Sequence, residues 1–523
     1  MEPLESNHAV LIDVGLTQLC IDDGYTVVTQ SGEILNANAK STNFDDIVEY
    51  VQSLPTFSGQ TLKITPVPLD RIEGLLEILT QANTVIDTEN ETLLGLRLTA
   101  LCQQSVNDGA SDIHIEVHRN QTRYLLRIDG LREVMTQFAN GQSATRQGRE
   151  SGVDLASYVF STLGKQDINE REPANDSFEV TLIWEGVQKT FEYRAALMPL
   201  DRGIKLTLRC LTPRDKPLLL DDMDLPTPYK TELLRSMNQR SGAIVICGPM
   251  GSGKSSLIYA MNDTVDSTAR CIHALEDPVE FDQKGICKTA VEPNTETKVG
   301  SGIFKDYAFY AKEQLRHDID VSVFGELRGH LTAKEYSWKA TTGGLAIATL
   351  HTNSAQGVPQ TFIEHMGISP AVVASPDFLR TIIHLKLIRK LCSSCAVSYE
   401  QAILQDSMKE KAEHLKSLLP DDYQSTYLKS HTGCDKCRNK GEKGRVVVME
   451  LIVLDDDDRR YIATQDYLGW KEALHKKGWP DIRDHALSRI RDGLVDIASA
   501  SEQINDLLPM AAADIYTGMR AAL

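Results

Sequence analysis

The sequence predicts the α/β fold class, and two observations carry this prediction. Short apolar runs alternate with helical segments from residue 229 to about residue 390, as in a parallel sheet covered by helices. The stretch AIVICGPMGSGKSSLIYAMND then places a glycine-rich loop between a strand-like run and a helix-like run. The predicted order is an N-terminal adaptor domain over 1–87, an α+β domain over 88–212, a linker over 213–228, the α/β core over 229–390, a four-cysteine region over 391–450 and a helical region over 451–523.

The segments before the core are predicted from their periodicity. Within 1–87, DDIVEYVQSL and RIEGLLEILTQA have helical spacing beside strand-like stretches, which indicates a small α/β domain. ETLLGLRLTALCQQSVNDGA is an amphipathic helix, and SDIHIEVHRNQTRYLLRIDGLREV alternates with period two around a turn at 119–121, as a hairpin does. Residues 178–211 repeat that strand-turn-strand pattern. Four prolines and several acids over 213–228 are typical of a linker.

Length and composition limit the possible functions. A chain of 523 residues with 41% hydrophobic residues is globular and too long for one ordinary core. The net charge of −18 argues against a general role in coating nucleic acids. The start MEPLESNHAV is acidic where a signal peptide is basic, and no apolar run approaches the roughly 20 residues that span a bilayer. We therefore expect a cytosolic protein whose membrane contact is peripheral.

The glycine-rich loop fits the phosphate-loop pattern G-x-x-x-x-G-K-[ST]. Its glycines let backbone N–H groups turn toward phosphate oxygens without a Cβ clash. Lys254 is expected to reach the β- and γ-phosphates, and the Ser255 hydroxyl to coordinate Mg²⁺. A turn that binds nothing is the alternative, and the flanking strand and helix argue against it. The predicted nucleotide-binding residues are Gly248, Pro249, Met250, Gly251, Ser252, Gly253, Lys254, Ser255 and Ser256.

Three polar groups follow strand-like runs after this loop. The run CIHALEDPVEF ends in acids that include Glu280, and Glu326 follows the apolar run VSVFG. His351 follows the run LAIATL, where a polar side chain can sense a γ-phosphate by hydrogen bonding. Taken alone, each is more often a cap or strand-end residue. Their succession after a phosphate loop favours a catalytic site at the carboxyl ends of the strands.

The cysteines fall into two groups. Two C-x-x-C pairs in a cytosolic chain predict a structural zinc site, closed by four thiolates, before they predict disulfides. Two metal-free thiol pairs are the alternative. The predicted zinc ligands are Cys392, Cys395, Cys434 and Cys437, and the predicted reduced core cysteines are Cys20, Cys102, Cys210, Cys247, Cys271 and Cys287. The acidic run 455–458 is interpreted as a solvated turn and not as a metal site.

Together these motifs resemble the type II secretion and type IV pilus assembly ATPases, a branch of the secretion ATPase superfamily. The matching boxes are GPMGSGKSS, LEDPVE, DIDVSVFGELRG and TTGGLAIATLHTN, with the hairpin segment upstream and RKLCSSC and GCDKCRNKGEKGRVVVMELI downstream. The resemblance covers about 90 to 455. It implies a RecA-like P-loop core that uses ATP and Mg²⁺, and a Zn²⁺-binding finger of the kind that retraction motors of this family typically lack.

Three positions depart from the family pattern. Ile319 stands where the family usually has proline, Gly329 where it has aspartate, and Gly344 where it has the first histidine of the histidine box. His351 is then the only histidine left in that box. We expect nucleotide binding to survive and γ-phosphate sensing to be retuned. Such a divergent form suits a plasmid-borne conjugative thin-pilus system.

The resemblance also implies a homo-hexamer with ATP at subunit interfaces, where an arginine from a neighbouring subunit stabilises charge on the transferred phosphoryl group. At period two, Arg123 and Arg127 would share a face of the hairpin. The alternative for each arginine is a surface ion pair, for instance with Asp129 or Glu133. The candidates are Arg123, Arg127 and Arg132 from the α+β domain, and Arg316 and Arg328 from the core.

The most economical interpretation is an ATP hydrolase that powers assembly of a type IV pilus or a type II secretion pseudopilus. Hydrolysis would move the α+β domain against the core around 213–228, and the force would pass to an inner-membrane platform protein. The enzyme would lie on the cytoplasmic face of a bacterial inner membrane, with no nucleic acid bound. A nucleic-acid translocase and a nucleotide-binding scaffold that hydrolyses nothing are the alternatives.

Overall fold

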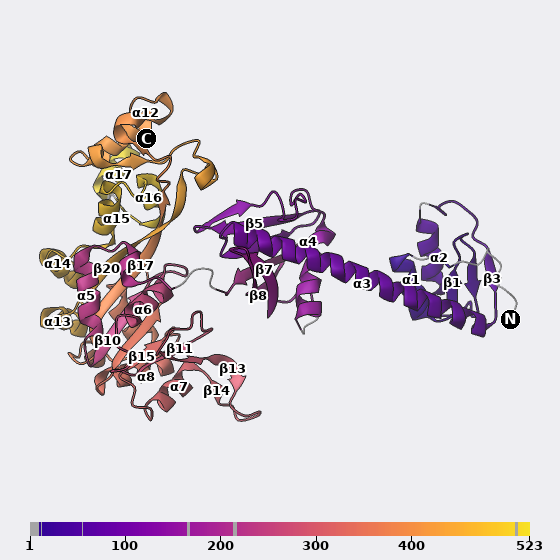
Figure 1. The fold of residues 1–523 in the computed structure, drawn as a ribbon, viewed down its shortest axis with the longest axis horizontal. Coiled ribbons are helices and arrows are strands. Elements are labelled where there is room, and N and C mark those ends of the chain that lie inside the picture. Colours follow the sequence, from indigo (N-terminus) through magenta and orange to yellow (C-terminus); the bar gives the residue numbers. More distant parts are fainter. Residues whose placement is uncertain (1–9, 12, 55, 165–167, 213–216, 508–510) are drawn as a thin grey trace. The chain divides into compact units, whose positions relative to one another are not determined.

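The computed structural model describes residues 10–11, 13–54, 56–164, 168–212, 217–507 and 511–523 (Figure 1). The chain divides into two compact units, one of 1–128 with 132–211 and one of 129–131 with 212–523. Within the described residues, no helix is both long enough and apolar enough to cross a bilayer.

The first part of unit 1 is a small α/β arrangement, as the periodicity predicts. Strands β1 (Thr26–Val28), β2 (Ile34–Asn36) and β3 (Ile64–Pro66) form one sheet, and helices α1 (Val14–Asp23) and α2 (Phe44–Ser53) share its apolar core. Helix α3 then runs from Leu69 to Asn107. The two helical segments predicted within that range are therefore one continuous helix. No proline or glycine interrupts 83–90, and the expected boundary at 87/88 falls inside the helix.

The second part of unit 1 is a six-stranded antiparallel sheet. The strand order is β6-β5-β4-β9-β8-β7. The predicted hairpin is confirmed, because β4 and β5 pair from Asp112 opposite Arg127 to Val117 opposite Thr122. The bounds are β4 Asp112–Val117, β5 Thr122–Ile128, β6 Leu131–Val134, β7 Ala174–Trp184, β8 Val187–Leu200 and β9 Gly203–Cys210, with helix α4 at Arg149–Ser157 and a π-helical turn at Tyr158–Leu163.

The core of unit 2 is a seven-stranded sheet with the order β12-β11-β15-β16-β10-β17-β20. Every neighbouring pair is parallel except β17 and β20, which are antiparallel. Strand β10 is buried on both faces, since Val245 packs into one apolar core and Ile244 and Ile246 into another. The bounds are β10 Gly242–Cys247, β11 Ile272–Glu276, β12 Cys287–Ala290, β15 Val321–Phe324, β16 Leu345–Leu350, β17 Leu379–Leu391 and β20 Glu442–Val453.

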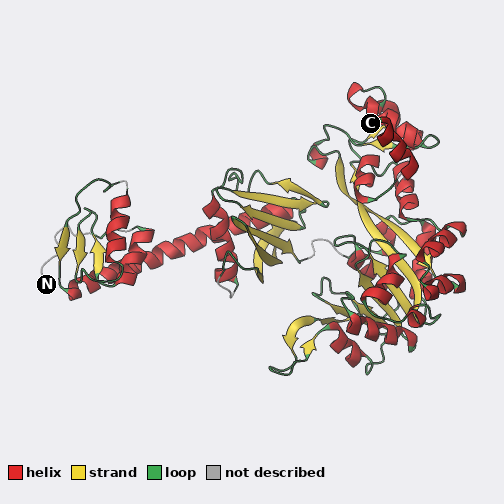
Figure 2. Cartoon of the chain, turned by 180° about the vertical axis from the view of Figure 1, so that it is seen from behind, coloured by secondary structure: helices red, strands yellow, loops and turns green. Residues whose placement is uncertain are grey.

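Helices cover both faces of this sheet (Figure 2). Tyr336 of α8 packs on one face, and Leu257 of α6 packs on the other. A small hairpin, β13 (Glu292–Glu296) with β14 (Phe304–Lys305), branches from the core. The helix bounds are α5 Thr227–Met237, α6 Lys254–Asn262, α7 Tyr307–Gln314, α8 His330–Thr341, α9 Gly357–Gln360 and α10 Pro370–Val373, with a second π-helical turn at Thr361–His365.

The predicted linker is wrong for its second half. Residues 213–216 lie outside the described residues, but a 3₁₀ turn spans Leu220–Met223 and α5 begins at Thr227. Leu220, Met223 and Leu225 are buried in the same apolar core as α5 and α6. The prolines and acids predict a linker, whereas the apolar side chains between them decide the packing.

The end of unit 2 is largely helical, as predicted. Its short elements are β18 Val397–Ser398, α11 Tyr399–Ala402, α12 Asp406–Leu418 and β19 Tyr427–Leu428, followed by α13 Asp456–Thr464, α14 Tyr467–Lys476, α15 Ile482–Arg491, α16 Ile497–Gln503 and α17 Ala512–Ala521. The interpretation of 455–458 as a solvated turn is wrong. Asp455 caps α13, and buried Asp458 accepts from the indole N–H of Trp470 at 2.9 Å.

Candidate functional site

The glycine-rich loop joins β10 to the first residue of α6. Gly248 (φ 147°) and Gly253 (φ 91°) occupy the left-handed half of φ space that favours glycine. A Cβ at Gly248 would also lie 2.4 Å from the Leu385 carbonyl oxygen of β17. The loop therefore has the shape expected from its sequence, and its lysine and first serine begin a helix whose N–H groups favour anions.

Lys254 lies inside this loop. Its Nζ donates to the carbonyl oxygens of Gly248 at 2.9 Å and Pro249 at 3.0 Å, and the residue is buried. Burial lowers the pKa of Lys254, and the negative charge of Glu326 partly opposes that shift. The electrostatic influence of Glu326 thus reaches the phosphate loop, although the two residues are far apart in the sequence.

Glu326 is at the centre of a charged cluster next to the loop. It follows β15, and its Oε2 accepts from Arg328 Nη2 at 2.9 Å. His351, which follows β16, places Nε2 3.6 Å from Glu326 Oε1. Arg328 also lies 3.8 Å from Asp277. The structure therefore brings together three of the predicted catalytic residues from two neighbouring strand ends.

Glu280 has a different environment. Burial raises its pKa, and the nearby charge of Glu276 raises it further. Glu276 itself is buried, accepts from the Tyr259 hydroxyl at 2.6 Å and lies 3.0 Å from Lys288 Nζ. Sequence reasoning did not select Glu276, Tyr259 or Lys288, since the signal was only a run of acids. The two candidate carboxylates therefore have different surroundings. Glu326 lies beside His351 and acts electrostatically on Lys254, whereas Glu280 lies near Glu276, which pairs with Lys288.

The glycine that precedes Glu326, Gly325, has a steric reason. A Cβ on Gly325 would lie 2.9 Å from both the Leu275 carbonyl oxygen and the Tyr307 hydroxyl. Both distances are shorter than real Cβ contacts. The backbone of β15 therefore approaches β11 too closely here for any larger residue.

Two of the departures from the family pattern meet at one side chain. Lys339 of α8 donates to the Ile319 carbonyl oxygen at 2.6 Å, and its Cε would lie 2.4 Å from a Cβ on Gly344. Lys339 therefore fills the space that a side chain at 344 would need. Gly329 precedes α8 with nothing within 4 Å of a Cβ there, so no contact explains that departure.

The arginine candidates have different environments. Arg123 and Arg132 both pair with Glu116, at 3.8 and 2.6 Å, so Glu116 is a partner that sequence reasoning did not name. Arg127 is half-buried on β5 opposite Asp112. Arg316 pairs with Glu313 at the exposed end of α7.

A further arginine escaped the sequence reasoning. Arg445 of β20 donates from Nη1 to the Gly251 carbonyl oxygen of the phosphate loop at 3.3 Å. Burial lowers the pKa of its guanidinium. Its position just after the second cysteine pair, in the motif GEKGR, was the available signal.

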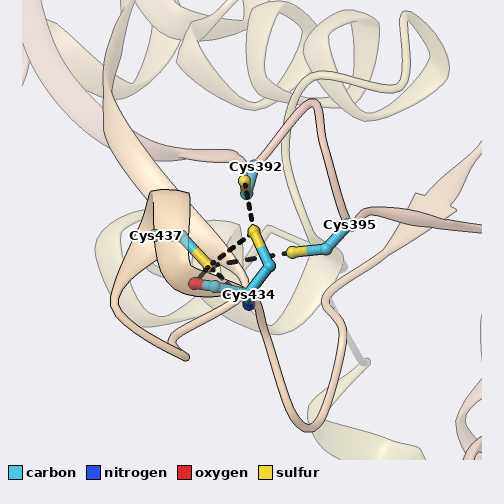
Figure 3. Close-up of side chains that lie close together, drawn as sticks. All are labelled: Cys392, Cys395, Cys434 and Cys437. Atoms are coloured by element: carbon cyan, nitrogen blue, oxygen red, sulfur yellow. Dashed lines mark hydrogen bonds between the residues drawn. The ribbon is translucent and has the colours of Figure 1, made fainter.

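The four predicted zinc ligands converge (Figure 3). Their sulfur atoms all lie within 4.8 Å of one another. Three of the separations are 3.7–3.8 Å, namely Cys392 to Cys434, Cys395 to Cys437 and Cys434 to Cys437. A tetrahedral ion with Zn–S bonds of about 2.3 Å requires an edge of about 3.8 Å, whereas a disulfide requires about 2.05 Å. The donor set and its spacing thus fit a closed Cys₄ zinc site.

The backbone supports negative charge at this cluster. Burial opposes ionisation of Cys437, but N–H groups of Cys434, Gly441 and Lys440 outweigh it and lower the pKa of this thiol to about 6. The distances from Cys434 N and Gly441 N to Cys437 Sγ are 3.2 and 3.1 Å. Among the remaining cysteines, Cys20, Cys102 and Cys247 are buried as predicted, whereas the expectation is wrong for Cys287, which is exposed at the start of β12.

We expect purified protein to contain about one zinc ion per chain, because four thiolates close a tetrahedral shell. Metal analysis and thiol titration measure this. Cys434→Ser should lower the zinc content and loosen the finger, with a much smaller effect on nucleotide binding. Cys287→Ser, which alters an exposed thiol outside the cluster, is the matched control and should leave zinc unchanged. A zinc-free protein whose four cluster thiols all titrate in the native state would contradict the assignment.

Comparisons with known proteins agree with these motifs. The family model described as "Type II/IV secretion system protein" matches residues 87–504. The type II secretion system ATPase E of Vibrio cholerae is 30% identical over 429 residues, which cover 82% of this chain and 78% of that protein. The type II secretion system protein E of Aeromonas hydrophila is 28% identical over 436 residues, covering 83% and 79%.

Solved structures support the fold alone. The pilus retraction motor PilT with bound ADP matches with a TM-score of 0.50 at 22% identity, covering 80% of this chain and 98% of that one. The Legionella pneumophila ATPase DotB matches with a TM-score of 0.52 at 16% identity, covering 77% and 93%. The α/β arrangement of this chain is therefore similar to that of these two proteins.

Proposed function

This chain belongs to the type II/IV secretion system protein family, and from that membership we propose that it is a hexameric ATPase that powers assembly of a type IV pilus or a type II secretion pseudopilus. The observation that carries the proposal is the cluster of Glu326, His351 and Arg328 beside a complete phosphate loop. The finger of four cysteines supports an assembly motor over a retraction motor. The genes next to its own gene would identify the pilus or secretion system that it serves. They would also show whether that system is plasmid-borne or chromosomal.

The residues of the site have complementary roles in this proposal. Lys254 and the loop N–H groups bind the β- and γ-phosphates, and Ser255 holds Mg²⁺, which neutralises phosphate charge when bound. Glu326 orients the attacking water and accepts its proton. His351, which contacts Glu326, senses the γ-phosphate. Arg328 holds the Glu326 carboxylate from the same chain, which assigns it a positioning role in cis.

The phosphate loop supplies positive charge to only one side of the γ-phosphate. The opposite side therefore needs a positively charged hydrogen-bond donor. We place Arg127 of a neighbouring subunit there, with Arg132 and Arg123 behind it. Arg316, which follows α7 in the core and pairs with Glu313, is a further candidate.

Mixing two inactive variants tests this arrangement. Arg127→Ala and Lys254→Ala should each be inactive alone, and partial ATPase activity should return when their subunits exchange. Some mixed interfaces then hold an intact Lys254 facing an intact Arg127. Phosphate release by the mixture, with mass-resolved confirmation of mixed oligomers, measures this. Arg194→Ala, which alters an exposed arginine on β8, is the control and should be active alone.

Two outcomes would contradict the assignment of Arg127. A mixture that stays inactive although mixed hexamers form means that Arg127 is not the donor in trans. Full activity of Arg127→Ala alone means that the residue serves only a surface contact. A strictly monomeric active enzyme would contradict the hexamer itself.

Force would arise from movement of the α+β domain against the core and pass to an inner-membrane platform protein. Asp224 forms an ion pair with Lys390, with 3.2 Å between Oδ2 and Nζ, and precedes the buried Leu225. The anchored part of 213–228, which includes Asp224 and Leu225, therefore moves with the core in this proposal.

A nucleotide-binding scaffold without hydrolysis is the second candidate. It is favoured by one observation, the space at Gly344 that Lys339 fills, since the first histidine of the box cannot be restored there without displacing the lysine. Direct measurement of phosphate release separates the two candidates.

A further inference from the structure

Glu450 is a buried carboxylate that the proposed chemistry does not use. It lies on β20 opposite His384 of β17, and its side chain is 4% exposed. Oε1 lies 3.5 Å from His384 Nδ1. A carboxylate in such a place is unfavourable unless hydrogen bonds compensate for lost hydration, so the groups it binds indicate why it is there.

Glu450 binds the backbone of two segments that are distant in sequence. Oε1 accepts the N–H of Ala355 at 2.6 Å, and Oε2 accepts the N–H of Ile482 at 3.2 Å. Ala355 ends the loop that leaves β16 and carries His351, whereas Ile482 begins α15 of the C-terminal helical region. One side chain therefore joins the predicted γ-phosphate sensor loop to the helices at the end of the chain.

The same loop is also held from the phosphate-loop side. Cys247, the last residue of β10, places Sγ 3.6 Å from the Ser354 carbonyl oxygen. Ala355 is fully buried between these two contacts. The position of His351 relative to Glu326 thus depends on a short segment fixed by β10 at Ser354 and by Glu450 at Ala355.

Resting on the proposed function, we propose that Glu450 is a positioning residue for hydrolysis. It fixes the His351 loop through the Ala355 N–H and relays the state of the C-terminal helices through the Ile482 N–H. It touches no reacting atom. Its role is to keep His351 within reach of Glu326 and of the γ-phosphate.

Substitution of Glu450 by glutamine distinguishes this positioning role from a role in filling space. Glu450→Gln keeps the shape, but its amide has one acceptor oxygen and one NH₂ donor, so it cannot accept both N–H groups. Leaving a buried N–H without its acceptor corresponds to roughly a 10-fold to 100-fold effect. We expect kcat to fall by about that factor, with KM for ATP changed less than about threefold, because the phosphate loop is untouched.

The experiment measures kcat and KM of the full chain for Glu450→Gln in the native and His351→Ala backgrounds. If Glu450 acts through the His351 loop, its effect on kcat should shrink to less than about threefold once His351 is absent. Glu442→Gln is the matched control, a buried glutamate on the same strand that binds Arg389, Lys429 and Ser499. It should lower Tm without this coupling.

The failures are distinguishable. Equal kcat losses from Glu450→Gln in both backgrounds, or no loss at all, overturn the positioning role while wild-type turnover upholds the ATPase. Absence of wild-type turnover contradicts the proposed function itself. If Glu450→Gln does not fold, Glu450→Asp keeps both acceptor oxygens on a shorter stem. Its kcat should fall less in the His351→Ala background than in the native one, and equal falls overturn the proposal.

Discussion

We expect Lys254→Ala to lower ATP turnover by about 100-fold or more, a loss typical of removing one preorganised charge donor at a phosphoryl site. The buried ammonium group of Lys254 donates to two carbonyl oxygens of the loop. Its loss therefore removes the positive charge that would face the phosphates, together with two hydrogen bonds that hold the loop. The fold should persist, since α6 is anchored by buried Leu257 and Met261.

The measurement combines phosphate release with circular dichroism and zinc content. Lys334→Ala is the matched control, because it removes an exposed lysine on α8 of the same core. It should retain turnover. Undiminished hydrolysis by a folded Lys254→Ala protein would refute the assignment of the phosphate loop.

Glu326→Gln should bind ATP and fail to hydrolyse it, with a loss of about 100-fold or more in kcat. The amide keeps the shape but loses the charge that orients water, and it weakens the ion pair with Arg328. Nucleotide affinity and single-turnover hydrolysis measure the two steps separately.

Glu280→Gln is the matched comparison for that variant. Burial and the charge of Glu276 raise the pKa of Glu280, which disfavours its charged form relative to an ordinary carboxyl, so an uncharged amide should disturb this position less than it disturbs Glu326. We expect a much smaller loss of turnover. Normal turnover by Glu326→Gln together with loss in Glu280→Gln would mean that the catalytic carboxylate is Glu280.

Local patterns predicted the strands that carry the site. The runs 321–324 and 345–350 are strands with those bounds, because a buried parallel strand is a continuous apolar run whose end is marked by glycine or a polar residue. The zinc ligands were equally accessible, since C-x-x-C spacing is itself a geometric constraint.

Contacts between distant segments were not accessible. Three contacts join elements whose pairing no local pattern encodes. Glu116 pairs with Arg123 and Arg132. Lys339 fills the space beside Gly344, and Arg445 donates to the Gly251 carbonyl oxygen. Side-chain partners depend on strand register and helix placement, which arise only in the folded chain.

Two of the wrong predictions, the linker over 213–228 and the solvated turn over 455–458, concern segments whose sequences also contain a signal for the observed structure. The leucines and methionine of 218–225 indicated burial, but the surrounding prolines favoured a linker. Asp455 with Asp458 three residues later is the spacing of a helix N-terminal capping box, and the structure contains that box.

The most direct test of the central claim is phosphate release from ATP by the purified, zinc-loaded chain in the presence of Mg²⁺, with Lys254→Ala and Glu326→Gln measured in parallel. We expect Mg²⁺-dependent turnover by the wild-type oligomer and background release by both variants, while Glu326→Gln still binds ATP. Wild-type release no greater than that of Lys254→Ala, from protein that is oligomeric and binds ATP, would contradict the claim that this chain is an ATP-hydrolysing motor.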